Sequence, residues 1–246
     1  MTRCAIFHPP SSILAFALAL ALCALPGRAA DRPPGVDEKL WSLLVQIDAR
    51  SAKVKDLTAD FTQEKFTPLL KKPLLSTGTI RIKGPTSLWN TRQPEPTILR
   101  VDEKSIKLLY PRQKVLEVYA TDQRMGALAA SPFPRLDVLS KHFTFEQIPT
   151  KDLGVQTTDG SHIALRMRPT DAQLKEHIDE VSVLLEVATG YVKKAQTIDP
   201  DGDRIVLSFA NIRANTGLSD ADLALDVPPG VSVTHPLEGD QQGKDK

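Results

Sequence analysis

The sequence predicts an α+β protein that is mostly antiparallel β-sheet, with the sheet curved around one apolar face and helices packed on that face. Apolar and polar residues alternate through several short segments between residues 57 and 119, which is typical of strands with one dry and one wet face. Only a few residues separate these segments, so we expect antiparallel hairpins. An amphipathic helical segment precedes them, and an apolar region without alternation follows at residues 124–148.

Residues 1–29 have the pattern of a secretory signal peptide. Arg3 supplies a positive charge, an almost wholly apolar run covers residues 13–25, and Gly27-Arg28-Ala29 places small residues at the cleavage-specifying positions. The apolar run is shorter than the roughly 20 residues that span a bilayer. We therefore expect export and cleavage near Ala30, with an uncleaved membrane anchor as the less favoured alternative.

Both cysteines of the chain, Cys4 and Cys23, lie inside this leader. The mature protein is therefore expected to have no disulfide, so a sizeable hydrophobic core must stabilise it. The segment Leu20-Ala21-Leu22-Cys23 is similar to the lipidation signal of bacterial lipoproteins, but the bulky Leu22 stands where a small residue is usual. A lipid anchor at Cys23 is the less favoured alternative.

Charge and histidine spacing argue against two classes of partner. The chain has 31 Lys and Arg against 30 Asp and Glu, and loss of Arg3 and Arg28 with the leader leaves 29 basic residues and a net charge near −1. No large basic field is therefore expected to attract nucleic acid. The histidines after the leader share no short spacing that predicts a metal site: they are His142, His162, His177 and His235.

Three aspartates at alternate positions, Asp199, Asp201 and Asp203, are spaced like calcium ligands. An EF-hand loop also needs Gly at its sixth position and an acidic ligand at its twelfth. Arg204 and Ala210 occupy those positions, so we interpret the aspartates as part of a hairpin turn. No metal site, cofactor site or catalytic motif is predicted.

The amino-terminal part of the mature chain predicts one helix. Residues 30–36, with Pro33 and Pro34, are expected to form a flexible entry, and Asp37 is suited to cap the helix that follows. Apolar residues then recur at helical spacing for about four turns. They are Leu40, Leu43, Leu44, Ile47 and Val54.

The first series of strands is defined by alternating apolar residues and by the turns between them. A loop at residues 68–73 separates the first two strands, Pro94 and Pro96 interrupt pairing, and residues 102–105 form a further turn. The alternating apolar residues are Leu57, Ala59, Phe61, Ile80, Ile82, Leu99, Val101, Ile106, Leu108 and Tyr110.

The pattern changes at residues 124–148. Apolar residues at mixed helical spacings, with Pro132 and Pro134 between them, predict two short helices across the open side of the sheet. Strands return afterwards, with turns at residues 157–160, 189–190 and 200–202, and we expect one domain over residues 37–236 and a disordered tail over 237–246. The apolar positions of the later strands are Ile163, Leu165, Met167, Val181, Val183, Leu185, Ile205, Leu207 and Phe209.

The apolar face of this sheet has two interpretations. It is ordinary core if another layer covers it, and it lines a cavity if part of it stays uncovered. One long helix and two short ones are little material for so many strands, which favours a hydrophobic cavity. The predicted cavity residues are Leu44, Ile47, Leu57, Phe61, Ile80, Ile82, Trp89, Leu99, Val101, Leu108, Leu165 and Val183, and the predicted lid residues are Leu128, Phe133, Leu136, Leu139 and Phe143.

Several segments, taken in order and spacing, match the motifs of one known family. They are Asp60-Phe61-Thr62-Gln63; Gly78 to Pro85, as Gly-x-Ile-x-Ile-Lys-x-Pro; Trp89 with Gln93-Pro94; Ile98-Leu99; Ile106 to Pro111; and Asn211, Asn215, Leu218 and Pro228 to Val231. Together they resemble the LolA-type periplasmic carriers of outer-membrane lipoproteins over nearly all of the mature chain. Leu223 or Leu225 stands where the family usually has Phe.

The resemblance implies an incomplete, unclosed β-barrel with a helical lid over a hydrophobic cavity that takes lipoprotein acyl chains. It also implies a periplasmic, non-enzymatic protein that receives cargo from an inner-membrane ABC transporter and delivers it to an outer-membrane receptor. We expect a monomer. One departure is Gly84, which stands where relatives carry an Arg that ties the lid shut, so the resting state of the lid and the identity of the cargo stay open.

Three other functions also stay open. A carrier or sensor of another amphiphile, such as a glycolipid, a phospholipid or a polyene lipid, would have the same fold, and the lipid that copurifies would distinguish it. An enzyme would cluster titratable groups inside the cavity. A purely structural adhesion module would have a filled core and no bound lipid.

Overall fold

The computed structural model describes residues 31–120, 136–157 and 159–236 of the chain. The predicted signal peptide, the predicted tail at 237–246 and the predicted lid residues Leu128 and Phe133 lie outside these ranges. Residues 31–36, expected as a flexible entry, contain a turn in which the N–H of Val36 donates to the carbonyl oxygen of Pro33 at 3.3 Å, and the Val36 side chain is buried. In the described part of the chain, no helix has the length and hydropathy needed to cross a membrane.

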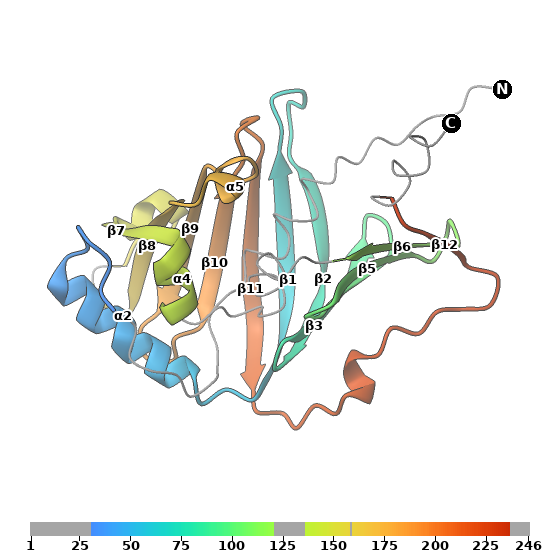
Figure 1. The fold of residues 1–246 in the computed structure, drawn as a ribbon, viewed down its shortest axis with the longest axis horizontal. Helices are drawn as coiled ribbons and strands as arrows, with labels where there is room; N and C mark the ends of the chain where they lie inside the picture. The colour runs from blue at the N-terminus through green and yellow to red at the C-terminus, as the bar shows by residue number, and fades with distance from the viewer. Residues whose placement is uncertain (1–30, 121–135, 158, 237–246) are drawn as a thin grey trace, which may run out of the picture.

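The strands form one sheet in the order β12-β6-β5-β4-β3-β2-β1-β11-β10-β9-β8-β7 (Figure 1). Neighbouring strands are antiparallel except β12 and β6, which are parallel. Because β12 and β7 are the two ends of this order, the sheet is not closed, as predicted. The strands are β1 (Asp56–Phe66), β2 (Leu74–Lys83), β3 (Thr86–Gln93), β4 (Thr97–Val101), β5 (Ser105–Tyr110), β6 (Val115–Ala120), β7 (Phe143–Ile148), β8 (His162–Pro169), β9 (Glu180–Glu186), β10 (Val192–Ile198), β11 (Arg204–Ala214) and β12 (Ser232–Thr234).

The central pair of the sheet joins the two halves of the chain. β1 pairs with β11 from Leu57 opposite Ala214 to Phe66 opposite Arg204, which confirms that the strands before and after residues 124–148 belong to one sheet. The register shifts near Asp60, where β11 carries one extra residue. Asn211 lies in this bulge with φ +51° and donates from Nδ2 to Oδ2 of Asp60 at 2.7 Å. Asparagine tolerates such a left-handed backbone better than most side chains do.

The predicted helix is confirmed as α2 (Glu38–Ser51), and Asp37 caps it by accepting from the N–H of Leu40 at 2.9 Å. Leu40, Leu44 and Ile47 are buried on one side of it. Together with α4 (Leu136–His142), α2 lies over the half of the sheet formed by β7 to β10 (Figure 1). The other short helical segments are η1 (Thr150–Leu153), α5 (Ala172–Lys175) and η2 (Ala221–Leu223).

Of the two short helices predicted within residues 124–148, the structure describes one, α4, and corrects where it ends; residues 124–135 lie outside the described ranges. Helix α4 ends at His142, and Phe143 is the first residue of the edge strand β7, so this predicted lid residue is not in a helix. Phe143, Phe145 and Ile148 are buried, whereas Thr144 and Glu146 are exposed. The helical spacing of Leu136, Leu139 and Phe143 predicted that the helix continues through Phe143. The alternating burial of a strand begins at that residue instead.

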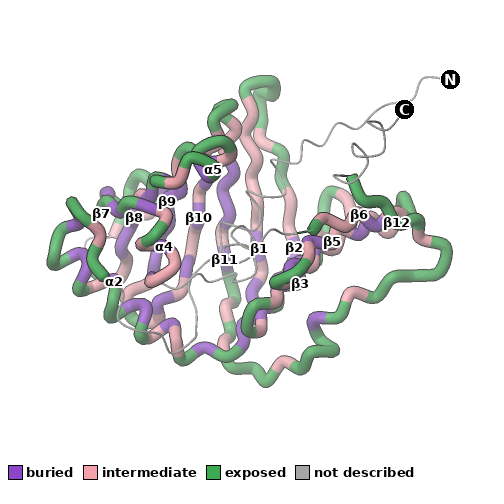
Figure 2. The backbone as a smooth tube through the Cα atoms, in the orientation of Figure 1, coloured by how far each residue is buried: buried purple, intermediate pink, exposed green. Residues whose placement is uncertain are grey.

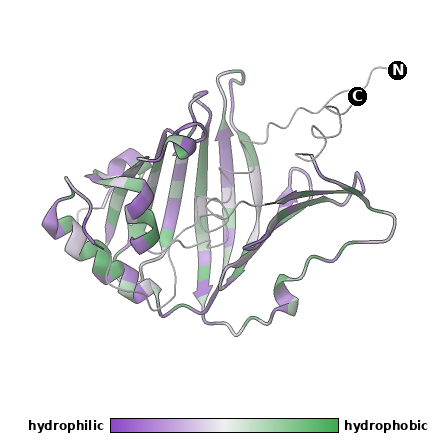
Figure 3. Ribbon diagram, viewed as in Figure 1, coloured by the Kyte–Doolittle hydropathy of each residue, from purple (hydrophilic) through white to green (hydrophobic). Residues whose placement is uncertain are grey.

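The sheet has an apolar inner face and a more polar outer face, which appear as alternating colours along the strands in Figure 3. The segment after β11 crosses the outer face of β2 to β4. Outward-pointing side chains hold it there: Arg81 donates to the carbonyl oxygen of Asp222 at 3.3 Å, and Arg100 donates from Nε to that of Leu223 at 3.0 Å. The segment is largely exposed (Figure 2), but Leu223 is buried. It then adds β12 to the edge of β6.

Candidate functional site: the apolar inner face

The structure places all twelve predicted cavity residues in one hydrophobic cluster on the inner face. Eleven of them are buried, and Leu108 is half-buried against the cluster. The cluster extends from β7 through the centre of the sheet to β5, and it includes residues of α2 and α4. These residues are thus brought together as predicted, and their binding of a ligand stays a prediction.

The centre of the inner face is a group of three aromatic side chains, Phe61, Trp89 and Phe209. The ring centroids of Phe61 and Trp89 are 5.2 Å apart, and those of Trp89 and Phe209 are 6.3 Å apart, both in edge-to-face arrangements. Gly78 stands opposite Phe61, and a Cβ there would lie 2.8 Å from the Phe61 ring and 2.2 Å from the carbonyl oxygen of Asn90. This glycine is therefore required by close packing, because any side chain would collide with the ring and the backbone.

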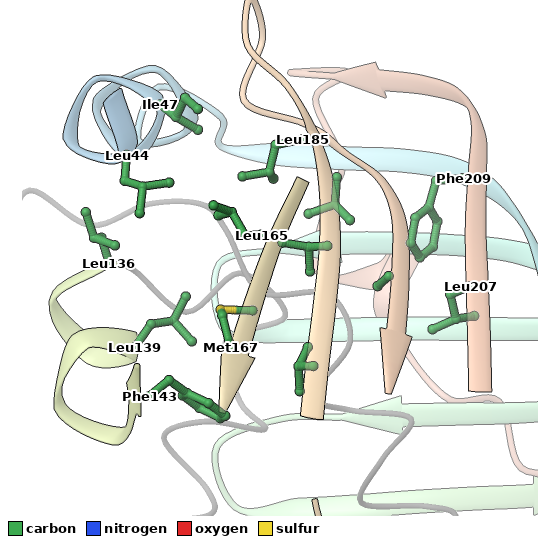
Figure 4. Packing of buried hydrophobic residues seen from close by; sticks show 14 of the residues in the cluster. Leu44, Ile47, Leu136, Leu139, Phe143, Leu165, Met167, Leu185, Leu207 and Phe209 are labelled. Carbon is green, nitrogen blue, oxygen red and sulfur yellow. The ribbon is translucent and has the colours of Figure 1, made fainter. Parts of the chain in front are cut away.

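The half of the inner face under the helices is packed by aliphatic side chains. Leu44 and Ile47 of α2 and Leu136 and Leu139 of α4 point toward the side of the sheet that carries Leu165, Met167 and Leu185 (Figure 4). Of the predicted lid residues, Leu136 and Leu139 are buried in this layer.

A polar contact fixes α4 to α2. Asp48 of α2 is buried, and its Oδ1 accepts from the N–H of Leu136, the first residue of α4, at 3.1 Å. The first N–H groups of a helix have no partner inside that helix, so a carboxylate from a neighbour stabilises the helix start. The start of α4 is therefore fixed to α2 by this hydrogen bond, in addition to the burial of Leu136 and Leu139.

The inner face also carries polar groups that the sequence analysis missed. The row of cross-strand neighbours Ile80, Trp89, Leu99 and Leu108 ends on Glu117 of β6. Oε2 of Glu117 accepts from the hydroxyl of Tyr119 at 2.9 Å and from that of Tyr110 at 3.3 Å. Burial raises the pKa of both tyrosines, and the neighbouring Glu117 carboxylate raises it further. The hydroxyls therefore stay protonated donors, and the apolar face ends in a polar cluster.

Gln63 is a second missed polar residue of this face. It has the same strand parity as Leu57 and Phe61, stands opposite Leu207, and its buried Oε1 accepts no hydrogen bond among the described residues. The sequence contained a signal, because Gln63 continues the apolar alternation of β1 and ends the quoted Phe-x-Gln motif. An unpaired buried acceptor is costly unless a partner arrives.

Gly84, the departure from the family motif, lies in the two-residue turn between β2 and β3. Lys83 pairs with Thr86, and Gly84 has φ +53°. A hairpin turn of this kind requires a positive φ at its first position, which glycine adopts without strain. An arginine here would find open space for its Cβ but would strain the backbone, so the glycine follows from the turn.

The aspartates at residues 199–203 form a hairpin turn between β10 and β11, as predicted. Oδ1 of Asp199 accepts from the N–H groups of Asp201 at 3.1 Å and Asp203 at 2.9 Å. Asp203 also forms an ion pair with Lys65 at 2.9 Å. Within the ranges that the structure describes, no group of three or more His, Cys, Asp or Glu residues is arranged to hold a metal ion.

These features define a class of protein: an unclosed antiparallel sheet with an apolar inner face and helices packed against part of it. The family model of the outer membrane lipoprotein carrier protein LolA matches residues 52–223, which is more than half of the chain. The chain therefore belongs to the LolA family.

Relatives agree with this assignment. The chain is 26% identical over 197 residues to the outer-membrane lipoprotein carrier protein of Vibrio parahaemolyticus, covering 76% of this chain and 83% of that relative. It is 24% identical over 189 residues to the protein of the same name from Bordetella avium, covering 76% and 85%. Among solved structures, an uncharacterized conserved protein from Thermus thermophilus matches with a TM-score of 0.51 at 11% identity, covering 80% of this chain and 99% of that one, and this likeness concerns the fold alone.

Proposed function

We propose that this protein is a periplasmic carrier that holds the acyl chains of lipoproteins against its inner face and moves them from the inner to the outer membrane. It would act as a monomeric binding protein without catalysis. An inner-membrane ABC transporter would load it and an outer-membrane receptor would unload it. Membership of a carrier family supports the role, and the leader-like amino terminus supports the compartment. The observation that carries the proposal is the continuous apolar cluster that extends along an unclosed sheet.

The energetics of acyl chains favour a loosely fitting site. Burial contributes about 0.8 kcal/mol per methylene, so three chains with on the order of 45 methylenes would nominally gain more than 30 kcal/mol. Non-covalent affinity saturates near 20 kcal/mol, and a perfectly fitted carrier would never release its cargo. An inner face already occupied by the side chains of α2 and α4 suits reversible loading, because cargo must displace these contacts and their return favours release.

The two tryptophans of the chain allow a direct test. Trp89 lies at the centre of the inner face, whereas Trp41 lies in α2, with its ring centroid 6.0 Å from that of Phe145 in β7. In the single-tryptophan variant Trp41→Phe, a lipopeptide with brominated acyl chains should quench Trp89 on contact. The matched variant Trp89→Phe reports whether the chains also reach the half under the helices. Absence of quenching in both variants, with circular dichroism unchanged, would refute acyl-chain binding at the inner face.

Polar groups on the inner face favour a second candidate, a carrier or sensor of another amphiphile. Gln63 offers a buried acceptor that has no partner among the residues the structure describes, and Glu117 with Tyr110 and Tyr119 forms a polar end to the apolar row. A glycolipid or phospholipid would place its head near such groups and its chains on the leucines. Mass spectrometry of the lipid that copurifies from a periplasmic extract separates this candidate from a lipoprotein carrier.

A further inference from the structure

Four exposed leucines gather at the end of the β1–β2 hairpin. Single exposed leucines are common on protein surfaces and need no explanation. Here Leu69 is 91% exposed, Leu70 47%, Leu74 54% and Leu75 54%, all within seven consecutive positions. The hairpin extends beyond the neighbouring strands (Figure 1), and its end is exposed (Figure 2). We call residues 67–75 the hairpin tip.

A turn hydrogen bond, an ion pair and a cation–π contact stabilise the hairpin tip and the strand residues next to it. The N–H of Leu70 donates to the carbonyl oxygen of Thr67 at 3.1 Å, which closes a turn with Pro68 and Leu69 at its centre. Proline fixes its own φ at this position of a turn. Below the turn, Lys65 pairs with Asp203, and the guanidinium carbon of Arg204 lies 3.8 Å from the centroid of the Phe66 ring. The leucines are therefore presented at the end of a long, paired strand.

The charges of the hairpin tip are all positive. Residues 67–75 include Lys71 and Lys72 and no acidic residue, and Glu64 lies below the tip, opposite Leu75. Lys65 is paired with Asp203, whereas Lys71 and Lys72 are exposed beside the leucines. The acidic turn at residues 199–203 is adjacent, but the β1–β2 hairpin extends past it (Figure 1). The outermost surface of this end of the molecule thus combines apolar and basic side chains.

We propose that the hairpin tip docks the protein on an anionic lipid bilayer, with the leucines in the headgroup region and Lys71 and Lys72 on the lipid phosphates. Leucine with lysine is the composition of interfacial membrane contacts. Protein interfaces instead favour Tyr, Trp and Arg and are depleted in Lys, and residues 67–75 contain none of those three. A contact of this size is reversible, as a protein that visits a membrane and leaves requires.

Vesicle binding tests the proposal without any cargo. We expect the mature full-length protein to cosediment with vesicles of phosphatidylglycerol and phosphatidylethanolamine in equal parts, and more weakly with phosphatidylcholine vesicles. The double variant Leu69→Ser, Leu70→Ser should weaken binding at least about tenfold on both vesicles, because apolar insertion is lost. The double variant Lys71→Gln, Lys72→Gln should weaken binding roughly thirtyfold on the anionic vesicles only.

Matched controls separate this effect from general loss of charge or fold. Lys53 and Lys55 are exposed near the opposite end of β1. The double variant Lys53→Gln, Lys55→Gln therefore removes the same charge at a site far from the hairpin tip and should leave vesicle binding unchanged. The exposed Val45 of α2 provides the control Val45→Ser. The tip variants should keep the wild-type melting temperature, because these side chains are exposed.

Two outcomes would overturn the docking proposal. One is failure of the wild-type protein to bind either vesicle, and the other is equal binding by the wild type and the leucine variant. Concentration-dependent dimerisation that the leucine variant abolishes, together with no vesicle binding, would assign the tip to self-association instead. The quenching assay contains no vesicle, so docking and acyl-chain binding can fail independently.

Discussion

At the scale of single residues, Asp56 connects the start of β1 to the segment that leaves β11. Its carboxylate accepts from the N–H of Thr216 at 2.6 Å, from the hydroxyl of Thr216 at 2.7 Å and from the N–H of Gly217 at 3.0 Å. Asn215, with φ +56°, turns the chain toward it and accepts from the N–H of Lys55 at 2.7 Å. The two asparagines of the family motif, Asn211 and Asn215, thus share a left-handed backbone.

Replacing Asp56 by Asn should cost stability in a pH-dependent way. Burial raises the pKa of Asp56, but the hydrogen bonds from Thr216 and from the backbone outweigh it, so the pKa lies below its ordinary value of 3.8. A carboxyl with a depressed pKa stabilises the fold above its unfolded pKa, and this contribution is lost as the pH falls through the folded pKa. Urea unfolding should show Asp56→Asn less stable by about 1.5–3 kcal/mol at neutral pH.

The difference in the free energy of unfolding between the wild type and Asp56→Asn should become smaller in acid, below about pH 4. Other carboxylates titrate equally in both proteins, so the difference isolates Asp56. If the difference in unfolding free energy is equally large at neutral pH and near pH 3, the variant is destabilised by poorer packing of the amide and not by loss of a charged acceptor.

The inner-face residues could be predicted from the alternation of apolar residues along each strand. Residues whose position depends on the register between two strands could not be predicted from the sequence. Ile80, Ile82 and Trp89 could be assigned because apolar side chains on alternate positions must share a face. Glu117 could not, because only the register of β5 with β6 reveals that it continues the row of Leu108. The role of Gly84 was likewise hidden until the turn between β2 and β3 gave its φ.

At the scale of elements, the helix and most strands followed from periodicity, and the exceptions have identifiable causes. Strand β10 was not anticipated, because a register shift between Val192 and Lys194 breaks its alternation. The boundary between α4 and β7 was missed, because Leu136, Leu139 and Phe143 keep helical spacing across it. Phe143 is apolar in both patterns, so only its pairing with Pro169 of β8 decides its element.

Helix α4 should loosen when its polar link to α2 is removed. In Asp48→Ala, the N–H of Leu136 loses its acceptor, and loss of a helix-start acceptor typically costs about 0.5–2 kcal/mol. Hydrogen exchange of the amides of residues 136–142 should therefore accelerate by about threefold to thirtyfold, while the amides of β1 and β11 keep their protection.

Asp48→Asn is the matched control for α4, because an amide oxygen can still accept the hydrogen bond. It should exchange more slowly over residues 136–142 than Asp48→Ala does. Uniform acceleration across the whole sheet in both variants would mean that Asp48 supports global stability and does not hold α4 locally.

At the scale of the whole molecule, the segment after β11, which we call the strap, crosses the outer face of the sheet and covers the edge of β6. It is held by Arg81, Arg100 and an ion pair of 2.7 Å between Lys83 and Asp220, and it ends in β12 beside β6. An exposed edge strand invites pairing with another chain. A protein truncated after Gly230 should therefore expose the β6 edge and self-associate as its concentration rises, as light scattering would detect.

Truncation after Pro236 keeps β12 and provides the control, which should stay monomeric over the same concentrations. If both truncated proteins scatter alike, the β6 edge is harmless and β12 has another role. The comparison also separates the strap from its final strand, because both proteins retain Leu223.

The pairing of β1 with β11 has a consequence for how the chain folds. Leu57 must meet Ala214, so the middle of the sheet forms only after nearly all of the chain has been synthesised. Contacts between such distant positions carry a large loop-closure cost and slow folding. Until β11 arrives, the hairpins from β1 to β6 have an open edge and an apolar face with no opposite half. The order of synthesis therefore leaves this chain partly folded and prone to aggregation until β11 is available. A factor that binds and covers β1 during that interval would raise the yield of folded protein.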